Sequence, residues 1–272
     1  MQSTGVGISM EPAPLRLAER LLALLSRPTN GTDLSGGVEE WNDANALDLL
    51  RREFPGFDAM IGGKGVLDFG CGNGWQALAM AQGGAGYVLG VDTNERCLRT
   101  ARDLAARHSL PTGRLGFAHS IGPDMLGGFD VAISQNSFEH LADPASALRQ
   151  LRHAVRPRGL VLITFGPPWL APYGSHMYFF TNLPWVHLLF SERTVMRVRS
   201  RFRSDGAQRY EEVEGGLNRM TVGRFERLVR ASGLQPKWKR YRCIRGLDAL
   251  ANIPAARELC INVVSCVLSN PS

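Results

Sequence analysis

The sequence lacks any apolar run that could cross a bilayer, because its longest stretches, such as Leu183 to Phe190, are short and interrupted. Its first residues also lack the charged start and apolar core of a secretion signal. We therefore expect a cytoplasmic protein without a transmembrane segment.

Cysteine is scarce as well. The chain has five cysteines, an odd number without C-x-x-C spacing: Cys71, Cys97, Cys243, Cys260 and Cys266. This pattern predicts reduced thiols rather than disulfides or a zinc site. No cysteine is expected to bind a metal.

Acidic residues are fewer than basic ones, with 25 Asp and Glu against 31 Lys and Arg and a net charge of +6. A positive balance suits nucleic acid, anionic lipid or an anionic small substrate alike, so it selects no partner. Nothing in the composition indicates an oligomeric state.

From residue 65 onward, short β-type runs alternate with amphipathic stretches of helical period. This alternation predicts an α/β fold of the Rossmann-like, doubly wound kind, with a mostly parallel seven-stranded sheet. The expected strands are Gly65 to Phe69, Tyr87 to Asp92, Leu115 to Ala118, Phe129 to Ser134, Leu160 to Phe165, Lys237 to Ile244 and Cys260 to Leu268. No obvious helix separates the last two, which indicates an antiparallel last strand.

Two segments fall outside this alternation. Residues 1–58 predict a helical appendage or lid, with helices at Leu15 to Leu25 and over residues 38–54. Residues 166–216 form an aromatic, Arg-rich insert after the fifth strand, without a clear period. We therefore expect one domain over residues 59–272 that carries this insert.

The strongest motif is an apolar strand that ends in an acid and runs into three alternate glycines, Gly70, Gly72 and Gly74. Glycines permit a tight turn and let a ligand approach the start of the next helix closely. A dinucleotide fingerprint would need glycine where this chain has Trp75, so the motif disfavours NAD. Asp68 would repel a phosphate beside this turn but attract an ammonium group.

A second acid, Asp92, ends the next strand, where a carboxylate can accept both ribose hydroxyls of a nucleoside. Together with Asp68 it describes a ligand with an amine at one end and a ribose at the other. Here the sequence resembles the class I S-adenosylmethionine-dependent methyltransferases, whose first motif looks like residues 66–74 and whose second-strand acid looks like Asp92. Their later signatures resemble residues 129–133, 138–144 and 155–160, in that order.

The resemblance implies S-adenosylmethionine as the cofactor, bound across the carboxyl ends of the first, second and fourth strands. It places Gly70, Gly72, Asp92, Gln135 and Asn136 around the cofactor, Thr93 beside the ribose, and Ser120 and Ile121 along the adenine. One departure is that no acid follows the third strand, where many relatives carry one for the adenine amino group.

The catalytic candidates are Glu139 and His140 after the fourth strand and His176 in the insert. Methyl transfer needs a nucleophile in line with the methyl group, and an imidazole can remove a hydroxyl proton near neutral pH. Alternatively, Glu139 and His140 cap and orient the next helix, and His176 is a packing residue. Relatives that methylate ubiquinone precursors also bind a metal here through acids and a histidine, but one acidic position is Asn136 in this chain, so we expect no metal.

The insert follows the strand after which this family commonly builds its substrate cover, so its aromatic and histidine side chains are candidates to line the acceptor pocket. These are Tyr173, Tyr178, Trp185 and His187. Its alternate arginines would share one face of an extended strand and could hold an anionic substrate, or could form a solvated basic surface. They are Arg197, Arg199, Arg201 and Arg203.

The leading hypothesis is methyl transfer to a small molecule, by an O-methyltransferase of lipid, sugar or secondary metabolism. A second replaces the acceptor with RNA or another polymer, but Gln135-Asn136-Ser137-Phe138 stands where an Asn-Pro-Pro-Tyr motif for base amines would be, so nucleic acid is not expected. A third is a binding protein that keeps the fold without catalysis, against which the intact glycine turn argues.

Overall fold

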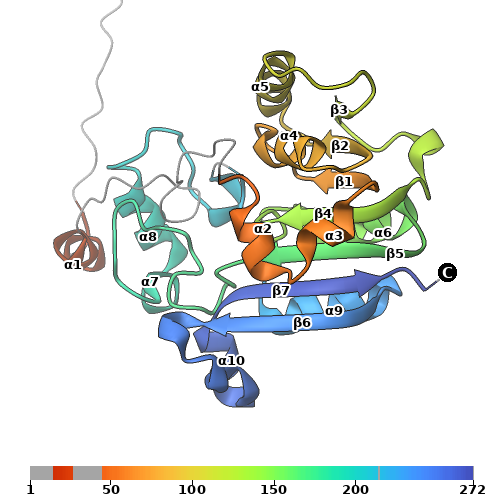
Figure 1. Ribbon diagram of the computed structural model, residues 1–272. Helices are drawn as coiled ribbons and strands as arrows, with labels where there is room; N and C mark the ends of the chain where they lie inside the picture. Colours follow the sequence, from red (N-terminus) through yellow and green to blue (C-terminus); the bar gives the residue numbers. More distant parts are fainter. Residues whose placement is uncertain (1–14, 27–44, 214, 272) are drawn as a thin grey trace, which may run out of the picture.

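A computed structural model describes residues 15–26, 45–213 and 215–271. In it, seven strands form one sheet in the order β3-β2-β1-β4-β5-β7-β6 (Figure 1). The strands are β1 (Gly65–Phe69), β2 (Tyr87–Val91), β3 (Leu115–Ala118), β4 (Phe129–Gln135), β5 (Val155–Phe165), β6 (Gln235–Cys243) and β7 (Ile261–Ser269). All seven lie within a few residues of the expected strands.

The predicted fold class is confirmed. Strands β1 to β5 pair in parallel, whereas β7 pairs antiparallel with both β5 and β6. The last strand therefore enters the sheet between β5 and β6, and the antiparallel pair forms one edge. A short helix that the sequence did not indicate, α10 (Pro254–Cys260), precedes β7.

Helices cover both faces of the sheet, because successive strand residues point to opposite sides. Helices α6 (Pro144–Ala154) and α9 (Val222–Ser232) pack on the face that includes Ala132. Helices α2 (Asp48–Glu53), α3 (Phe57–Ile61) and α4 (Trp75–Gln82) pack on the face that includes Val131 (Figure 1). The other helices are α1 (Leu17–Leu25), α5 (Glu95–Ala106), α7 (Val186–Leu189) and α8 (Glu192–Arg199), with 3-10 turns at Pro123–Met125, Tyr210–Glu212, Ile244–Gly246 and Asp248–Asn252.

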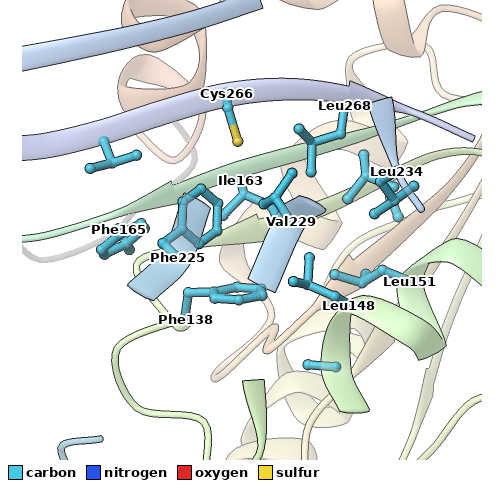
Figure 2. Packing of buried hydrophobic residues seen from close by; sticks show 14 of the residues in the cluster. Phe138, Leu148, Leu151, Ile163, Phe165, Phe225, Val229, Leu234, Cys266 and Leu268 are labelled. Carbon is cyan, nitrogen blue, oxygen red and sulfur yellow. The ribbon is translucent and has the colours of Figure 1, made fainter. Parts of the chain in front are cut away.

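One of these cores holds the loop after β4 in place. Phe138 is fully buried, and its ring lies 5.5 Å from that of Phe225 on α9, centroid to centroid. Phe225 lies in turn 4.9 Å from Phe165 at the end of β5 (Figure 2). Because Phe138 directly precedes Glu139 and His140, this packing fixes the backbone from which both side chains extend.

The insert after β5 builds a core of its own. Apolar side chains from α7, α8 and the connecting loops pack together there, and Leu22 of α1 joins them. In Figure 1 this body, with α1, α7 and α8, lies beside one end of the sheet. The segment expected to lack a period therefore folds as a compact cover.

The alternate arginines do not lie on an extended strand, so they do not share the one face that such a strand would give them. Arg197 and Arg199 lie on helix α8, whose N-terminus is capped by Ser191 accepting the Thr194 backbone N–H. Val195, Val198 and Arg199 are buried at helical spacing, because hydrophobic packing in the insert overrides the two-residue alternation. Arg199 is fully buried and forms an ion pair with Asp205 at 2.6 Å.

The expected boundary at residue 58 does not coincide with a break in packing. Leu50, Phe54 and Phe57 are buried in the same core as the strands of the sheet. The helix expected over residues 38–54 begins, within the described residues, only with α2 at Asp48. Residues 38–44 of that prediction lie outside the described residues.

A buried ion pair ties α2 to the far edge of the sheet. Glu53 is fully buried, and its carboxylate accepts a hydrogen bond from Ser265 on β7 at 2.8 Å. Arg242 on β6 lies 2.6 Å from the same carboxylate. These contacts join Glu53 to residues that are distant in the sequence but adjacent to it in the folded protein.

Replacing Glu53 by alanine is expected to lower the free energy of unfolding by about 2 kcal/mol, because the Arg242 guanidinium would lose its buried partner. Chemical denaturation of both proteins measures the difference. Glu95→Ala is the matched control, since Glu95 and Arg102 form an ion pair on the surface, and no measurable shift is expected there. Equal stability of Glu53→Ala and the unmodified protein would contradict the role assigned to this pair.

Candidate functional site

The turn between β1 and α4 depends on its glycines. Gly70, Gly72 and Gly74 all have positive φ angles, of 85°, 51° and 84°. A Cβ at Gly74 would lie 2.7 Å from the Ala101 side chain, and one at Gly70 would lie 2.9 Å from that of Ser137. The chain therefore needs glycine here both for backbone conformation and for close packing. At Gly72 nothing lies within 4 Å of such a Cβ, which leaves open space over the turn.

Asp92 is fixed to this turn. One carboxylate oxygen accepts the Gly72 backbone N–H at 2.9 Å, and the other accepts the Asn94 backbone N–H at 2.8 Å. The N-terminal cap of α5 is Asn94, whose side chain accepts from Arg96 and Cys97. Asn94, and not Asp92, therefore caps α5. The two hydrogen bonds of Asp92 hold its carboxylate beside the glycine turn.

Asp68 is a buried acid, and one of its carboxylate oxygens lacks a hydrogen-bond partner. Its side chain is 1% exposed, and Oδ2 has no hydrogen-bond partner among the described residues. Burial, and to a lesser degree the nearby Asp92 carboxylate, raises the pKa of Asp68 to about 7. A carboxylate in this position is stabilised by any cation that enters the turn.

The remaining residues expected at the cofactor lie at the carboxyl ends of the same strands. Gln135 ends β4 and is buried, with no hydrogen-bond partner for Oε1. Asn136 follows with a φ of 47°, and its N–H donates to Thr164 at 2.8 Å. Thr93 and Ser120 are exposed, and Ile121 is half-buried after β3. Because the strands are parallel, these positions face one edge of the sheet.

His140 has a defined tautomer. Its Nδ1 lies 2.6 Å from the Gly216 backbone oxygen. A carbonyl oxygen only accepts, so Nδ1 carries the proton and the neutral ring keeps a lone pair on Nε2. Such a ring can take a proton from a neighbouring hydroxyl.

The Asn218 side chain and backbone hold the loop that carries His140, a contact that the sequence did not indicate. The Asn218 side chain donates to the backbone oxygens of Phe138 and Leu141, at 2.8 and 2.7 Å. Its backbone N–H donates to the Glu139 carbonyl at 2.9 Å. Gly216 and Asn218 lie far from His140 in the chain, and no local motif marked them.

Glu139 points toward the end of β5. It is buried, and one carboxylate oxygen accepts the Gly166 backbone N–H at 3.1 Å. Burial raises its pKa. The structure therefore shows Glu139 joining the β4 and β5 loops.

His176 lies next to His140 across a small cavity, which Ser175 and Arg199 also line. The two imidazole rings are 5.5 Å apart at their centroids and nearly perpendicular. His176 is buried, and burial, followed by the proximity of His140, lowers its pKa to about 3. A group with so low a pKa is a weak base near neutral pH.

Side chains expected to line an acceptor pocket pack largely against the insert itself. His187 is buried, its Nε2 lies 2.5 Å from the Trp169 carbonyl, and burial lowers its pKa to about 4. The Trp185 indole donates to the Leu170 carbonyl at 3.1 Å. The rings of Tyr173 and Tyr178 lie 4.7 Å apart at their centroids and are tilted by 37°.

A larger hollow opens on the other side of His140. It has a volume of about 580 Å³, in the range of small-molecule sites. Its wall includes His140 and Gly216 together with the charged side chains of Arg219, Arg224 and Glu211. The hollow is a polar compartment that the sequence did not reveal, because its wall joins the β4 loop to the end of the insert.

The donor set does not fit a metal. No group of three or more His, Cys, Asp or Glu side chains able to hold an ion occurs in residues 15–26, 45–213 and 215–271. Near His140 the nearest acid in sequence, Glu139, is engaged with Gly166, and Asn136 stands at the position of a second acid.

The sheet order, the antiparallel β7 and the glycine turn flanked by Asp68 and Asp92 define a class I methyltransferase fold. Residues 67–163 match the family model described as "Methyltransferase domain". Over these residues the chain is similar to the S-adenosylmethionine-dependent methyltransferases, and its fold is the one they share.

Curated relatives share part of the chain. A ubiquinone biosynthesis O-methyltransferase of Pseudomonas aeruginosa is 36% identical over 130 residues, which cover 46% of this chain and 54% of that protein. One from Neisseria meningitidis is 34% identical over 134 residues, covering 48% of this chain and 55% of that protein. The chain thus spans about half the length of these relatives.

Solved structures share the fold. An S-adenosylmethionine-dependent methyltransferase of Mesorhizobium loti has a TM-score of 0.52 and 20% identity, covering 84% of this chain and 99% of that one. The [4+2]-cyclase SpnF has a TM-score of 0.55 and 16% identity, covering 93% of both chains. At such identities the likeness concerns the fold alone. No helix in the described part of the chain has the length and apolar character needed to span a membrane.

Proposed function

We propose that this chain is an O-methyltransferase that uses S-adenosylmethionine to methylate a hydroxyl group of a small molecule. The observation that carries the proposal is the buried, unpartnered Oδ2 of Asp68 beside three glycines of positive φ. An ammonium group placed there would form an ion pair with the Asp68 carboxylate. The names of the curated relatives support an oxygen acceptor.

The residues fit this cofactor in three places. Asp68 would bind the amino group, Asp92 would accept the ribose hydroxyls, and the space over Gly72 would admit the ligand. Thr93, Ser120 and Ile121 would border the nucleoside, and Gln135 and Asn136 would face the end that carries the methyl group. When bound, S-adenosylmethionine supplies a methyl group on a sulfonium sulfur.

His140 would act on the acceptor. A hydroxyl of a substrate in the adjoining hollow would donate to Nε2, and that nitrogen would take the proton as the oxygen attacks the methyl carbon. The cofactor, held by Asp68 and Asp92, would supply the methyl group to that oxygen and would keep the electron pair of its carbon–sulfur bond. We assign the base to His140 rather than His176 because His140 lines the hollow, whereas His176 is buried and its pKa is lowered to about 3.

The other candidates would shape the site. Glu139 would position the His140 loop through Gly166, and His176 would pack against the His140 ring. Tyr173, Tyr178, Trp185 and His187 would stiffen the cover over the acceptor side. Arg224 would favour an acceptor with an anionic group in the hollow, since Arg219 is paired with Glu192.

Cofactor affinity is expected to depend on pH through Asp68. Its pKa of about 7 means that the carboxyl is increasingly protonated below neutrality, and the proton must leave before an ammonium group can bind. The affinity should fall by about tenfold for each pH unit below 7 and stay level just above it. Calorimetric titration with S-adenosylmethionine and S-adenosylhomocysteine across this range measures the effect.

The same protein, supplied with methyl-labelled cofactor and a panel of hydroxylated small molecules, tests the reaction. Label transfer to a small acceptor would support the proposal. Tight binding without transfer to any acceptor would favour a binding protein or another reaction on this fold, as the cyclase with the same architecture illustrates. Absence of cofactor binding by the folded protein would refute the proposal.

A further inference from the structure

Helix α1 turns its leucine-rich side away from the protein. Leu17 is 85% exposed and Leu24 is 82% exposed, and Leu21 and Leu25 are about half exposed. Surface helices of globular proteins normally bury their apolar stripe and expose the polar one. The opposite orientation here leaves an apolar surface that needs a partner.

The exposed leucines form one continuous stripe. Residues four and seven positions apart share a helix face, so Leu17, Leu21 and Leu24 line up, with Leu25 beside them. The docked side carries fully buried Leu22, which enters the core of the insert, and Glu19, which accepts the Arg16 backbone N–H at 2.8 Å. The helix is therefore anchored to the protein by one face while the leucine stripe faces outward.

Positive charge borders this stripe. Arg16 and Arg20 are exposed on α1 itself. A groove beside α1 and α8 is lined by further cationic side chains, namely those of Arg193, Arg197 and Arg209. The groove is lined by four arginines and two acids. Glu19 accepts the backbone N–H of Arg16, Glu192 pairs with Arg219 and accepts the Tyr210 N–H, and Arg209 pairs with Glu211.

We propose that α1 is a membrane-surface helix, which places its leucines among the acyl chains of an anionic bilayer and its arginines at the phosphates. An apolar stripe flanked by arginines is the pattern of helices that lie in the plane of the interface. With nine residues, α1 is too short to span a bilayer.

A second copy of the chain fits this surface less well. Symmetric pairing through α1 would bring together two stripes that are each bordered by Arg16 and Arg20, while the acid of the helix, Glu19, is buried, and like charges at a contact oppose association. The phosphates of an anionic lipid surface would pair with Arg16 and Arg20, and its acyl chains would cover the leucines.

The membrane helix also lies near the acceptor side. The core that holds Leu22 includes Met177, Val213 and Leu217. The same three side chains line the cavity beside His140 and His176. A single packed layer therefore connects the proposed membrane face to the catalytic loop, although the membrane inference stands independently of the reaction.

The test uses the full chain and two vesicle types, pure phosphatidylcholine and an equal mixture of phosphatidylcholine and phosphatidylglycerol. The unmodified protein should sediment with the mixed vesicles, and less at high salt. Leu17→Ser/Leu21→Ser/Leu24→Ser should weaken this binding at least about tenfold, because the apolar stripe is lost. Arg16→Gln/Arg20→Gln should reduce the preference for anionic vesicles.

The matched control replaces three exposed leucines elsewhere, Leu126→Ser/Leu247→Ser/Leu259→Ser, and should bind like the unmodified protein. Circular dichroism and thermal unfolding should show that all variants are folded, since the replaced side chains are on the surface. Failure of the unmodified protein to bind mixed vesicles, or full binding by the α1 leucine variant, would overturn the proposal. So would a dimer in sedimentation velocity that the α1 leucine variant converts to monomers.

Discussion

Asp68→Asn is expected to weaken S-adenosylmethionine binding by about 100-fold while making the unliganded protein more stable. The loss follows from removing a buried charge that would pair with the cofactor's ammonium. The gain follows from the raised pKa, because at neutral pH the folded protein carries an unpartnered charge that the unfolded chain hydrates freely. Calorimetry and denaturant unfolding measure the two effects.

The sign of the stability effect depends on pH. The pKa of Asp68 is about 7 in the folded protein and about 3.9 in an unfolded chain, so the folded state holds its proton more tightly. Stability is therefore lost as the pH rises from about 4 toward 7, and asparagine avoids that loss. A gain on the order of 4 kcal/mol is expected at pH 8 and little at pH 4.

Asp103→Asn provides the comparison, because Asp103 is an exposed acid on α5 away from the glycine turn. That variant should match the unmodified protein in both affinity and stability. Unchanged cofactor affinity in Asp68→Asn would remove the central support for the cofactor site. A destabilised Asp68→Asn at pH 8 would show that Asp68 has a folding partner.

His140→Gln is expected to lower kcat by about 10² to 10⁴ and to leave cofactor affinity unchanged. Glutamine can still donate to the Gly216 carbonyl, so the loop should keep its position, but its amide does not take a proton at neutral pH. The measurement is the rate of label transfer to the acceptor found in the screen, together with calorimetric titration of the cofactor.

Two further variants separate catalysis from packing. His153→Gln changes an exposed histidine on α6 and should leave kcat unchanged. His176→Gln, checked for folding, should reduce the rate far less than His140→Gln. If only the His176 change abolished transfer, the base would be His176 and the assignment to His140 would be wrong.

The core of the fold followed from local pattern. Alternating strands and helices, together with an acid before alternate glycines, predicted the sheet and its glycine turn, because each signal lies within a few neighbouring residues. Gly70, Gly72 and Gly74 have positive φ angles, which glycine adopts readily because it lacks a Cβ atom. The boundaries of β1 and β3 agree with the structure residue for residue.

Where the structure differs from what the sequence predicted, the cause is mostly a contact between residues that are distant in the chain. The arginine alternation suggested a strand, yet burial of Val195 and Val198 made the segment a helix, and Ser191 was the capping signal that had been overlooked. The packing of Phe54 and Phe57 against the sheet, likewise, depends on side chains that meet only after folding.

By itself, the sequence determined the class of fold, the glycine turn and the acids beside it, because these depend on short-range preferences of the backbone. Only the tertiary structure sets the tautomer of His140, since the Gly216 carbonyl that its Nδ1 contacts comes from a distant part of the chain. It also decided which way the leucines of α1 face. A helical period defines a stripe, but only the packing of Leu22 into the insert determines that the stripe points outward.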